Sequence, residues 1–435
     1  MVQFKNCKLQ LQLEAQMPMI HFQSRQAGAT IRASEVKPKL DRFILGKIME
    51  QEKKSIEQLK EDSEFEHLFL DADSNMNNAL DYKMQITVFE KPQEIDLAPT
   101  GPDGRDNNEE KYAIFYANMG RQRDEIIYGL FSNPMVTIIC FKEKLRKYIE
   151  EHIIAFFLVT NFGTMQNKGF GSFMPAEWCK TSILSTEQEK KIASYYNQLN
   201  PGCHCYAMKF EGLPAAKATI ENKNKLCVKM SNNIRSFYSN MKSGQNFQGY
   251  SRSYLYQYMH NKVNIGNEKA WMKQQGISPN IAKPENEKKW EIPKHKLEEC
   301  YYVRAFLGIG PTIRYAKGYR DNTYRRLADK VTITINSKKL ERVSSPIFFK
   351  VIKNVVFIVA FEVSEELYDA EFVFDGTEYK GKKGKLKTPS KEIFAKTKYK
   401  FDIQDFMDEY VKYYNGDLRK KISINSNKKV VRIHA

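Results

Sequence analysis

The segment of this chain best suited to bind a ligand is a glycine-rich loop, Asn161-Phe162-Gly163-Thr164-Met165-Gln166-Asn167-Lys168-Gly169-Phe170-Gly171-Ser172-Phe173. Its glycines follow the spacing Gly-x5-Gly-aromatic-Gly and enclose amides and one cation. Glycine allows positive φ and close approach of backbone to a ligand, so the loop could offer N–H groups to phosphates or bases. Two sets of residues have candidate roles: Gly163, Gly169 and Gly171 for the shape of the loop, and Gln166, Asn167 and Lys168 as hydrogen-bond donors.

The spacing of the loop excludes two familiar phosphate-binding motifs. No Gly-Lys-Ser/Thr follows, as a P-loop requires, and Gly-x-Gly-x-x-Gly does not occur here. The segment 143–158 before the loop has an apolar face typical of a helix. A glycine-rich stop to that helix is therefore the structural alternative to a binding loop.

Two further segments carry cations that could bind an anion. Arg25, Arg32, Lys37 and Lys39 precede or lie on the first expected helix. Cations near a helix N-terminus oppose its dipole, but they would cost little if an anion bound there. The segment 308–320 places Arg314 and Arg320 between glycines and tyrosines, which suits backbone contact and base stacking. The alternative in both places is a solvated basic surface.

Cys203-His204-Cys205 is the segment that most resembles a metal site. A zinc site needs about four ligands, neighbours on a strand point to opposite faces, and no second cluster supplies the rest. We therefore predict neither a metal nor a cofactor. His21 could act as a general base or acid on a 2′-hydroxyl, as in a ribonuclease. A structural or RNA-contacting histidine is the alternative.

Several blocks of the sequence resemble known motifs. The glycine loop is similar to that of the RAMP superfamily, the RNA-binding subunits of CRISPR-Cas effector complexes. The segments 16–22 and 28–40 resemble the N-terminal signature of that superfamily. Glu341-Arg342-Val343-Ser344-Ser345-Pro346-Ile347 resembles an Arg-x-x-Ser-Pro element of the two-domain RAMP subunit of type III-B (Cmr) complexes. The segment 237–246 looks like a motif of some two-domain RAMP proteins.

The resemblance implies a non-catalytic RNA-binding subunit acting in antiviral defence. Its partners would be CRISPR guide RNA and target RNA, together with other RAMP subunits of a ribonucleoprotein. The glycine loop and the start of the first helix would contact RNA, with Arg32, Lys37 and Lys39 neutralising phosphate. Arg342 would do likewise in the second domain, or hold the Ser344-Ser345-Pro346 turn.

A rival hypothesis is a metal-independent endoribonuclease that processes CRISPR guide precursors, also built from two ferredoxin-like domains. That family usually has its glycine loop near the C-terminus. Here the loop lies mid-chain, which favours the binding subunit.

Charge is unevenly distributed along the 435 residues. The formal net charge is +17, yet residues 50–110 hold 17 acidic and 6 basic residues, so that the remainder carries +28. A surface of that sign attracts polyanions. Interleaved Phe and Tyr could stack on bases, although most of these rings must form core.

The expected environment of the chain is the cytoplasm. No secretion signal precedes the alternating N-terminal segment, and no apolar run is long enough to span a membrane, so we expect no membrane partner. Seven cysteines without CxxC spacing indicate a reduced compartment.

The elements that must position these residues predict an α+β fold with two ferredoxin-like (RRM/RAMP-type) domains and a helical insert between them. Residues 1–214 would form the first domain, with an acidic insertion at about 50–110 and an irregular loop over 91–110. Residues 215–297 would form the helical insert, and 298–435 the second domain. The segments with strand periodicity are 4–14, 82–88, 112–116, 136–140, 301–307, 331–335 and 355–363. Helical patterns begin at Ser34, Glu143, Ile403 and, through a Thr186-x-x-Glu189 capping box, Thr186.

Overall fold

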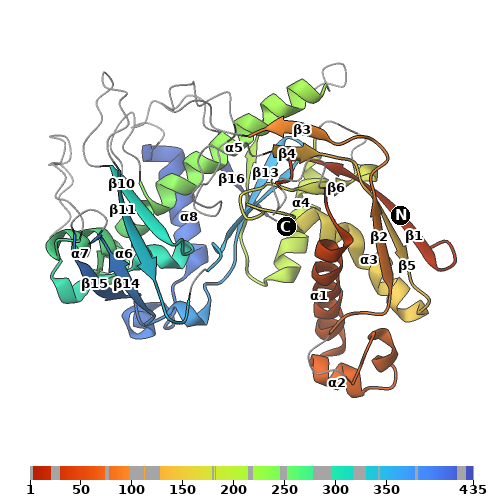
Figure 1. The fold of residues 1–435 in the computed structure, drawn as a ribbon, viewed down its shortest axis with the longest axis horizontal. Coiled ribbons are helices and arrows are strands. Elements are labelled where there is room, and N and C mark those ends of the chain that lie inside the picture. Colours follow the sequence, from red (N-terminus) through yellow and green to blue (C-terminus); the bar gives the residue numbers. More distant parts are fainter. Residues whose placement is uncertain are drawn as a thin grey trace.

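The computed structural model of the chain mixes helices with small antiparallel sheets (Figure 1). It describes residues 3–20, 30–73, 78–97, 112, 128–178, 181, 183–213, 219–244, 252–277, 295–316, 330–340, 343–377, 381–418 and 428–434. Arg25, Arg320, Arg342 and His21 lie outside these residues. The expected α+β class is confirmed.

The first sheet contains β1 (Lys8–Ala15), β2 (Lys83–Thr87), β5 (Met135–Ile139) and β6 (Phe173–Pro175), in the order β2-β5-β1-β6. Every neighbouring pair is antiparallel. In β1, alternate residues are buried and Leu9 and Leu11 lie opposite Ile138 and Val136. The predicted alternation therefore sets the buried face of this sheet.

Two helices join strands of the first sheet and pack against each other. They are α1 (Ala33–Glu52) and α3 (Glu143–Val159), each with its apolar stripe buried. Phe43 of α1 meets Phe156 of α3 with ring centroids 5.5 Å apart. The helix that precedes the glycine loop is thus fixed in the core.

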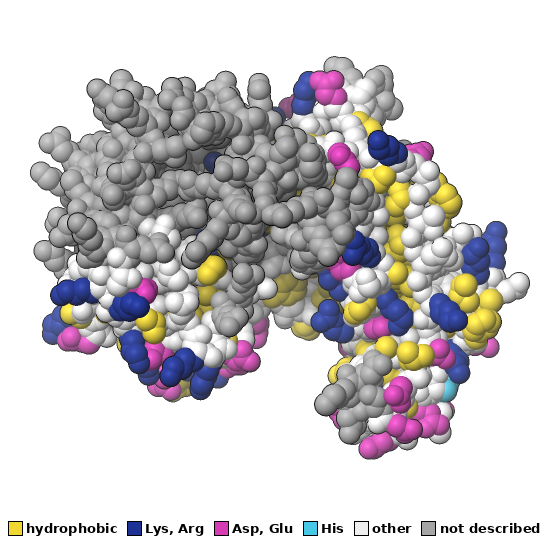
Figure 2. All heavy atoms as spheres, viewed as in Figure 1, with side chains coloured by type: hydrophobic (Ala, Val, Ile, Leu, Met, Phe, Trp, Pro, Cys, Tyr) yellow, Lys and Arg dark blue, Asp and Glu magenta, His cyan; other side chains and the backbone are white. Residues whose placement is uncertain are grey.

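The first part of the acidic segment forms a small lobe beside the first sheet. This lobe contains α2 (Ile56–Glu61) and a 3-10 turn, Glu66–Leu68. Figure 2 shows Asp and Glu side chains gathered over this lobe. Part of the segment expected to be irregular, Gln93–Asp96, forms strand β3 and pairs with β4 (Tyr128–Phe131). That pairing depends on a distant partner, which local periodicity does not reveal.

The second sheet combines a strand from the first half of the chain with strands from its last third. It contains β7 (Cys205–Lys209), β12 (Ile347–Ile352), β13 (Val355–Ala360) and β16 (Val430–Ile433), in the order β12-β13-β7-β16. All pairs are antiparallel. Helix α5 (Ile220–Lys242) follows β7, and α8 (Ile403–Tyr413) precedes β16.

The third sheet, with order β10-β11-β14-β15, lies beyond the second in Figure 1. Its strands are β10 (Thr312–Ala316), β11 (Lys330–Asn336), β14 (Glu371–Asp375) and β15 (Lys383–Lys387). Nearby are α6 (Tyr254–Val263), α7 (Glu268–Gln274) and the short parallel pair β8 (Gly266–Asn267) and β9 (Cys300–Tyr301). The remaining short helical turns are Ala176–Trp178, Leu297–Glu299, Val303–Leu307, Glu365–Leu367, Lys391–Thr397 and a π-helical turn at Tyr414–Leu418.

Two sequence predictions are wrong in detail. The predicted strand 301–307 is mostly a 3-10 turn, Val303–Leu307, after the two-residue strand β9. The capping box of α4 (Thr186–Leu199) is one residue earlier than predicted: Gln188 N donates to Ser185 Oγ at 3.2 Å, and Ser185 N donates to Gln188 Oε1 at 3.1 Å. Glu189 instead accepts from Lys209 Nζ at 2.6 Å.

Candidate nucleic-acid interface

The glycine loop begins at the end of α3 and requires its glycines. Gly163, Gly169 and Gly171 have φ of +78°, +88° and +64°, so the predicted positive φ is confirmed. A Cβ on Gly163 would lie 2.5 Å from Ile20 O, and one on Gly171 would lie 1.8 Å from Phe162 O. At Gly163 and Gly171, the backbone therefore approaches other segments of this chain closely.

Backbone hydrogen bonds join the loop to the segment that follows β1. Thr164 N donates to Ile20 O at 2.7 Å, and Gly171 N donates to Pro18 O at 3.0 Å. Gly163 N donates to Glu35 Oε1 of α1 at 2.7 Å. These amides are engaged within the protein, so a ligand would meet side chains and other backbone groups of the loop.

Lys39 and Gln166, two predicted site residues, meet each other. Lys39 Nζ donates to Gln166 Oε1 at 2.7 Å, to Asn161 O at 3.0 Å and to Glu35 Oε1 at 3.1 Å. Burial lowers the pKa of the Lys39 ammonium, against the opposing pull of Glu35. The pair ties α1 to the glycine loop.

Lys37 and Arg32 lie away from the contact between Lys39 and Gln166. Lys37 Nζ donates to Asp41 Oδ2 and to Leu80 O, both at 2.9 Å, and lies 4.2 Å from the centroid of the Tyr82 ring. Arg32, at the N-cap of α1, is exposed. Of the three predicted cations on or before α1 that the structure describes, Arg32, Lys37 and Lys39, the exposed one is Arg32, which suits contact with a large anion.

Lys168 is interior, contrary to the prediction of a donor at the surface. Its residue is 9% exposed, and its Nζ lies 3.2 Å from the centroid of the Tyr238 ring. Burial, with a smaller effect of Lys242, holds the pKa of Lys168 well below its ordinary value. The loop turns inward here because Lys168 forms a parallel bridge with Phe349 of β12.

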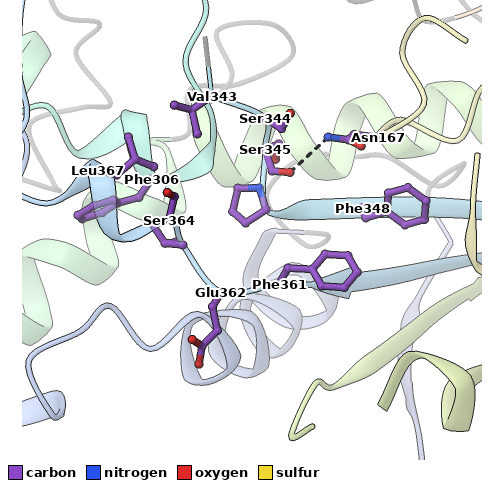
Figure 3. Close-up of a pocket in the computed structure, with 12 residues that line it drawn as sticks. Asn167, Phe306, Val343, Ser344, Ser345, Phe348, Phe361, Glu362, Ser364 and Leu367 are labelled. Atoms are coloured by element: carbon purple, nitrogen blue, oxygen red, sulfur yellow. Dashed lines mark hydrogen bonds between the residues drawn. The ribbon is translucent and has the colours of Figure 1, made fainter. Parts of the chain in front are cut away.

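Asn167, by contrast, lies at the rim of a pocket that the glycine loop shares with the Ser-Pro element (Figure 3). Its Nδ2 donates to Ser345 O at 3.4 Å, and its backbone oxygen accepts from Phe349 N at 3.3 Å. The pocket has a volume of about 360 Å³. Its lining residues are Asn167, Phe306, Val343, Ser344, Ser345, Pro346, Phe348, Phe361, Glu362, Val363, Ser364 and Leu367.

All four blocks that carry the family resemblance converge around this junction. Ile20 forms a bridge with Thr164, and Asn167 contacts Ser345. From the 237–246 segment, Phe237 and Tyr238 meet the Phe349 ring at centroid distances of 6.2 and 6.4 Å. Segments far apart in sequence thus form one structural unit.

Two cations that the sequence did not indicate support this junction, Lys350, which is buried, and Lys242, which is half-buried. Lys350 Nζ donates to Thr160 O at 2.7 Å and to Phe173 O at 3.0 Å, which links β12 to both ends of the glycine loop. Lys242 Nζ donates to Gly308 O at 2.6 Å and to Leu307 O at 3.1 Å. Burial, with Arg304 nearby, lowers the pKa of Lys242 to about 7. Neither lysine stands in a pattern that predicts burial.

Arg314, the remaining predicted cation among the described residues, lies on β10 opposite Thr332. The lysine-rich edge between 380 and 400 is interleaved with carboxylates, as Figure 2 shows on the lobe of β14 and β15. Lys383, Lys385 and Lys387 pair with acids at 2.8 to 3.0 Å. Exposed pairs of this kind stabilise little, but they reduce the net charge of the edge.

Within the described residues, no three His, Cys, Asp or Glu side chains gather as a metal site would require. No described helix combines the length and apolar character needed to span a membrane.

Two family models match this chain. The one described as the Cmr1 N-terminal domain matches residues 6–245, and the one described as the Cmr1 C-terminal domain matches residues 250–431. No curated protein matches. The crystal structure of Cmr1 from Pyrococcus furiosus in its apo form is similar over 88% of this chain and 98% of that chain, with 10% identity and a TM-score of 0.37.

Proposed function

We propose that this chain, which belongs to the Cmr1 family of RAMP subunits, binds guide and target RNA in antiviral defence. Cmr1 is one component of a multi-subunit type III-B CRISPR complex. The proposed RNA site is the junction of the glycine loop with the Ser344-Ser345-Pro346 turn. It would act in the cytoplasm, alongside other RAMP subunits.

The convergence of the four family-like blocks on one junction is the observation that carries this proposal, and two of them, the glycine loop and the Ser-Pro element, line its pocket. The pocket combines half-buried rings, Phe348 and Phe361, with the Asn167 amide and serine hydroxyls (Figure 3). Single-stranded RNA is recognised by proteins through splayed bases that stack on aromatic rings and donate or accept hydrogen bonds at their edges. Exposed Arg32, at the start of α1, supplies a cation for phosphate.

The order of the strands supports the finer fold prediction. In the first sheet, β1, α1, β2, β5, α3 and β6 follow a β-α-β-β-α-β sequence with the order β2-β5-β1-β6. In the second, β7, α5, β12, β13, α8 and β16 repeat that sequence with the order β12-β13-β7-β16. We infer two ferredoxin-like units. On this inference the second unit begins at β7, inside the range 1–214, and α5 is its first crossover helix.

We further propose that the junction binds RNA without cleaving it. Among the pocket's lining residues, Glu362 is the one with an ionisable side chain. Its Oε1 accepts from Lys400 Nζ at 2.6 Å, and Figure 3 shows the carboxylate pointing away from the pocket. General acid–base cleavage needs a titratable group within reach of the 2′-hydroxyl. The endoribonuclease alternative rested on His21, whose position is not described.

Titration of the purified chain with labelled single-stranded RNA at several salt concentrations tests this function. Affinity should fall steeply with salt, at a slope of roughly −0.7 per phosphate contacted. Arg32→Ala should weaken binding by about tenfold or more, the scale of a charge-assisted hydrogen bond, and Asn167→Ala by about fivefold, the scale of a neutral one. Lys147→Ala removes an exposed cation from α3, paired with Glu143, and serves as the matched control.

Three results would contradict the proposal. Affinity independent of salt would exclude phosphate contacts. Equal losses in Arg32→Ala and Lys147→Ala would indicate a diffuse basic surface in place of a site. Cleavage of the RNA on a gel, with or without divalent metal, would favour the endoribonuclease alternative.

A further inference from the structure

A second pocket, of about 260 Å³, lies where β7 begins and β16 ends, and different residues line it. Asn197 of α4 is among its lining residues, as are three residues with nitrogen-bearing side chains, His204, Arg432 and His434. Figure 1 shows the C-terminal end of the chain beside α4. None of the family-like blocks contributes a residue to this pocket.

Asp408 of α8 is hydrogen-bonded to Arg432 and lies close to His204. Its carboxylate accepts from Arg432 Nη1 at 3.2 and 3.3 Å and from the Tyr206 hydroxyl at 2.7 Å. His204 Nδ1 lies 3.0 Å from Asp408 Oδ2. Arg432 lies directly opposite Tyr206 in the β16–β7 register, and His204 is two residues before Tyr206, so all three project to the α8 side of the sheet.

The anchored residues leave donors for a ligand. Within the described part of the chain, the Arg432 guanidinium is hydrogen-bonded through Nη1, so Nη2 and Nε can serve a ligand. Because the Asp408 carboxylate can only accept, the His204 proton that faces it is on Nδ1, and Nε2 donates to a ligand when the ring carries a proton on both nitrogens. The Arg432 side chain is 38% exposed, which leaves it accessible from solvent.

The neighbouring thiols do not supply nucleophilic or metal-binding chemistry. Burial raises the pKa of Cys203 to about 11 and raises that of Cys205 further above its ordinary range. A thiol must ionise to attack or to ligate a metal. The candidate ligands in the pocket are thus nitrogen donors, and the Asp408 carboxylate is already engaged with Arg432.

We propose that this pocket binds a phosphate group, with Arg432 as the principal ligand and His204 and His434 as supporting donors. A guanidinium fixed by a carboxylate presents its remaining N–H groups in the planar fork that matches phosphate oxygens. The phosphate belongs either to RNA or to a free phosphate anion. This site does not depend on the RNA junction proposed above.

Titration of the full chain with inorganic phosphate, followed by calorimetry or by ³¹P line broadening, tests the proposal. Binding should saturate. Arg432→Ala should weaken it about tenfold, and Arg432→Lys by a smaller factor because lysine lacks the fork. Lys429→Ala, an exposed cation three residues earlier that does not line the pocket, should change it by less than about twofold. His204→Gln gives a second test should Arg432→Ala fail to fold.

RNA then distinguishes the sources of the phosphate. An oligonucleotide is compared with and without a 5′-phosphate, on the unsubstituted chain and on Arg432→Ala. A loss confined to the 5′-phosphorylated RNA assigns a terminal phosphate, an equal loss for both assigns the backbone, and no loss for either assigns the free anion. Phosphate binding that does not saturate, or that Lys429→Ala weakens as much as Arg432→Ala, would overturn the proposal and leave the test at Arg32 unaffected.

Discussion

At the scale of single residues, three lysines contact both halves of the candidate interface. Lys168, Lys242 and Lys350 all bring a primary amine into the interior, where backbone oxygens or aromatic rings meet it. Burial disfavours the charged form. Each of these amines therefore either loses its proton or lowers the stability of the fold.

Lys242 allows a direct measurement of that cost. Its pKa in the folded chain is about 7, whereas an unfolded lysine titrates at about 10.4. Between these values the unfolded state binds more protons, so Lys242 should make the free energy of unfolding rise with pH by at most about 1.4 kcal/mol per unit. Denaturant titrations at pH 7, 8 and 9 should show the rise, and Lys242→Met should lower its slope by this contribution while that of Lys168 and Lys350 remains. Lys225→Met, exposed on the same helix, is the control and should retain the full slope.

Which of these lysines are interior could not be predicted from the sequence. Local patterns resolve which face of a helix or strand is apolar, and Lys168 lies in an aperiodic loop. Its burial follows from the approach of Phe349 and Tyr238, which are distant in sequence. The positive φ of Gly163, Gly169 and Gly171 was predictable because glycine spacing reports backbone conformation directly.

At the scale of elements, sequence periodicity predicted the helices and strands that bury a continuous apolar stripe. It missed the strands whose structure depends on pairing with a distant strand. The helices α1, α3 and α8 and the strands β2, β5, β11 and β13 all lie where their patterns indicate. The sequence patterns did not predict strand β16, because its residues are largely exposed and its extended structure depends on pairing with β7. The three-residue strand β6 was likewise too short to show a period.

The glycine loop allows a paired test of what its conformation requires. A methyl group on Gly171 would lie 1.8 Å from Phe162 O, whereas one on Gly202 would meet nothing within 4 Å, although both residues have positive φ. Gly202→Ala should therefore cost only the conformational strain, about 1 to 2 kcal/mol. Gly171→Ala should cost at least about 2 kcal/mol more, because the loop must open. Equal losses in denaturant titrations would mean that the contact with Phe162 relaxes without cost.

At the scale of the whole molecule, the two family-model segments are interlocked. The N-terminal match ends at residue 245 and the C-terminal match begins at 250. Yet β7, in the first segment, pairs on both edges with strands of the second, β13 and β16. Phe237 of α5 likewise packs against Tyr410 of α8, with centroids 4.8 Å apart. The hydrophobic core runs across the junction without a break.

A split chain should expose this interdependence. Residues 1–245 and 246–435, expressed separately, should each be poorly folded, because the first leaves both edges of β7 unpaired and the second lacks the central strand of its sheet. Expressed together, they should copurify and regain a cooperative thermal transition. Truncating the second fragment after residue 418 removes β16 and should weaken the association, since one edge of β7 is then open. If either half alone melts cooperatively near the temperature of the intact chain, the interlocked sheet is not required for folding, and the two segments are independent domains.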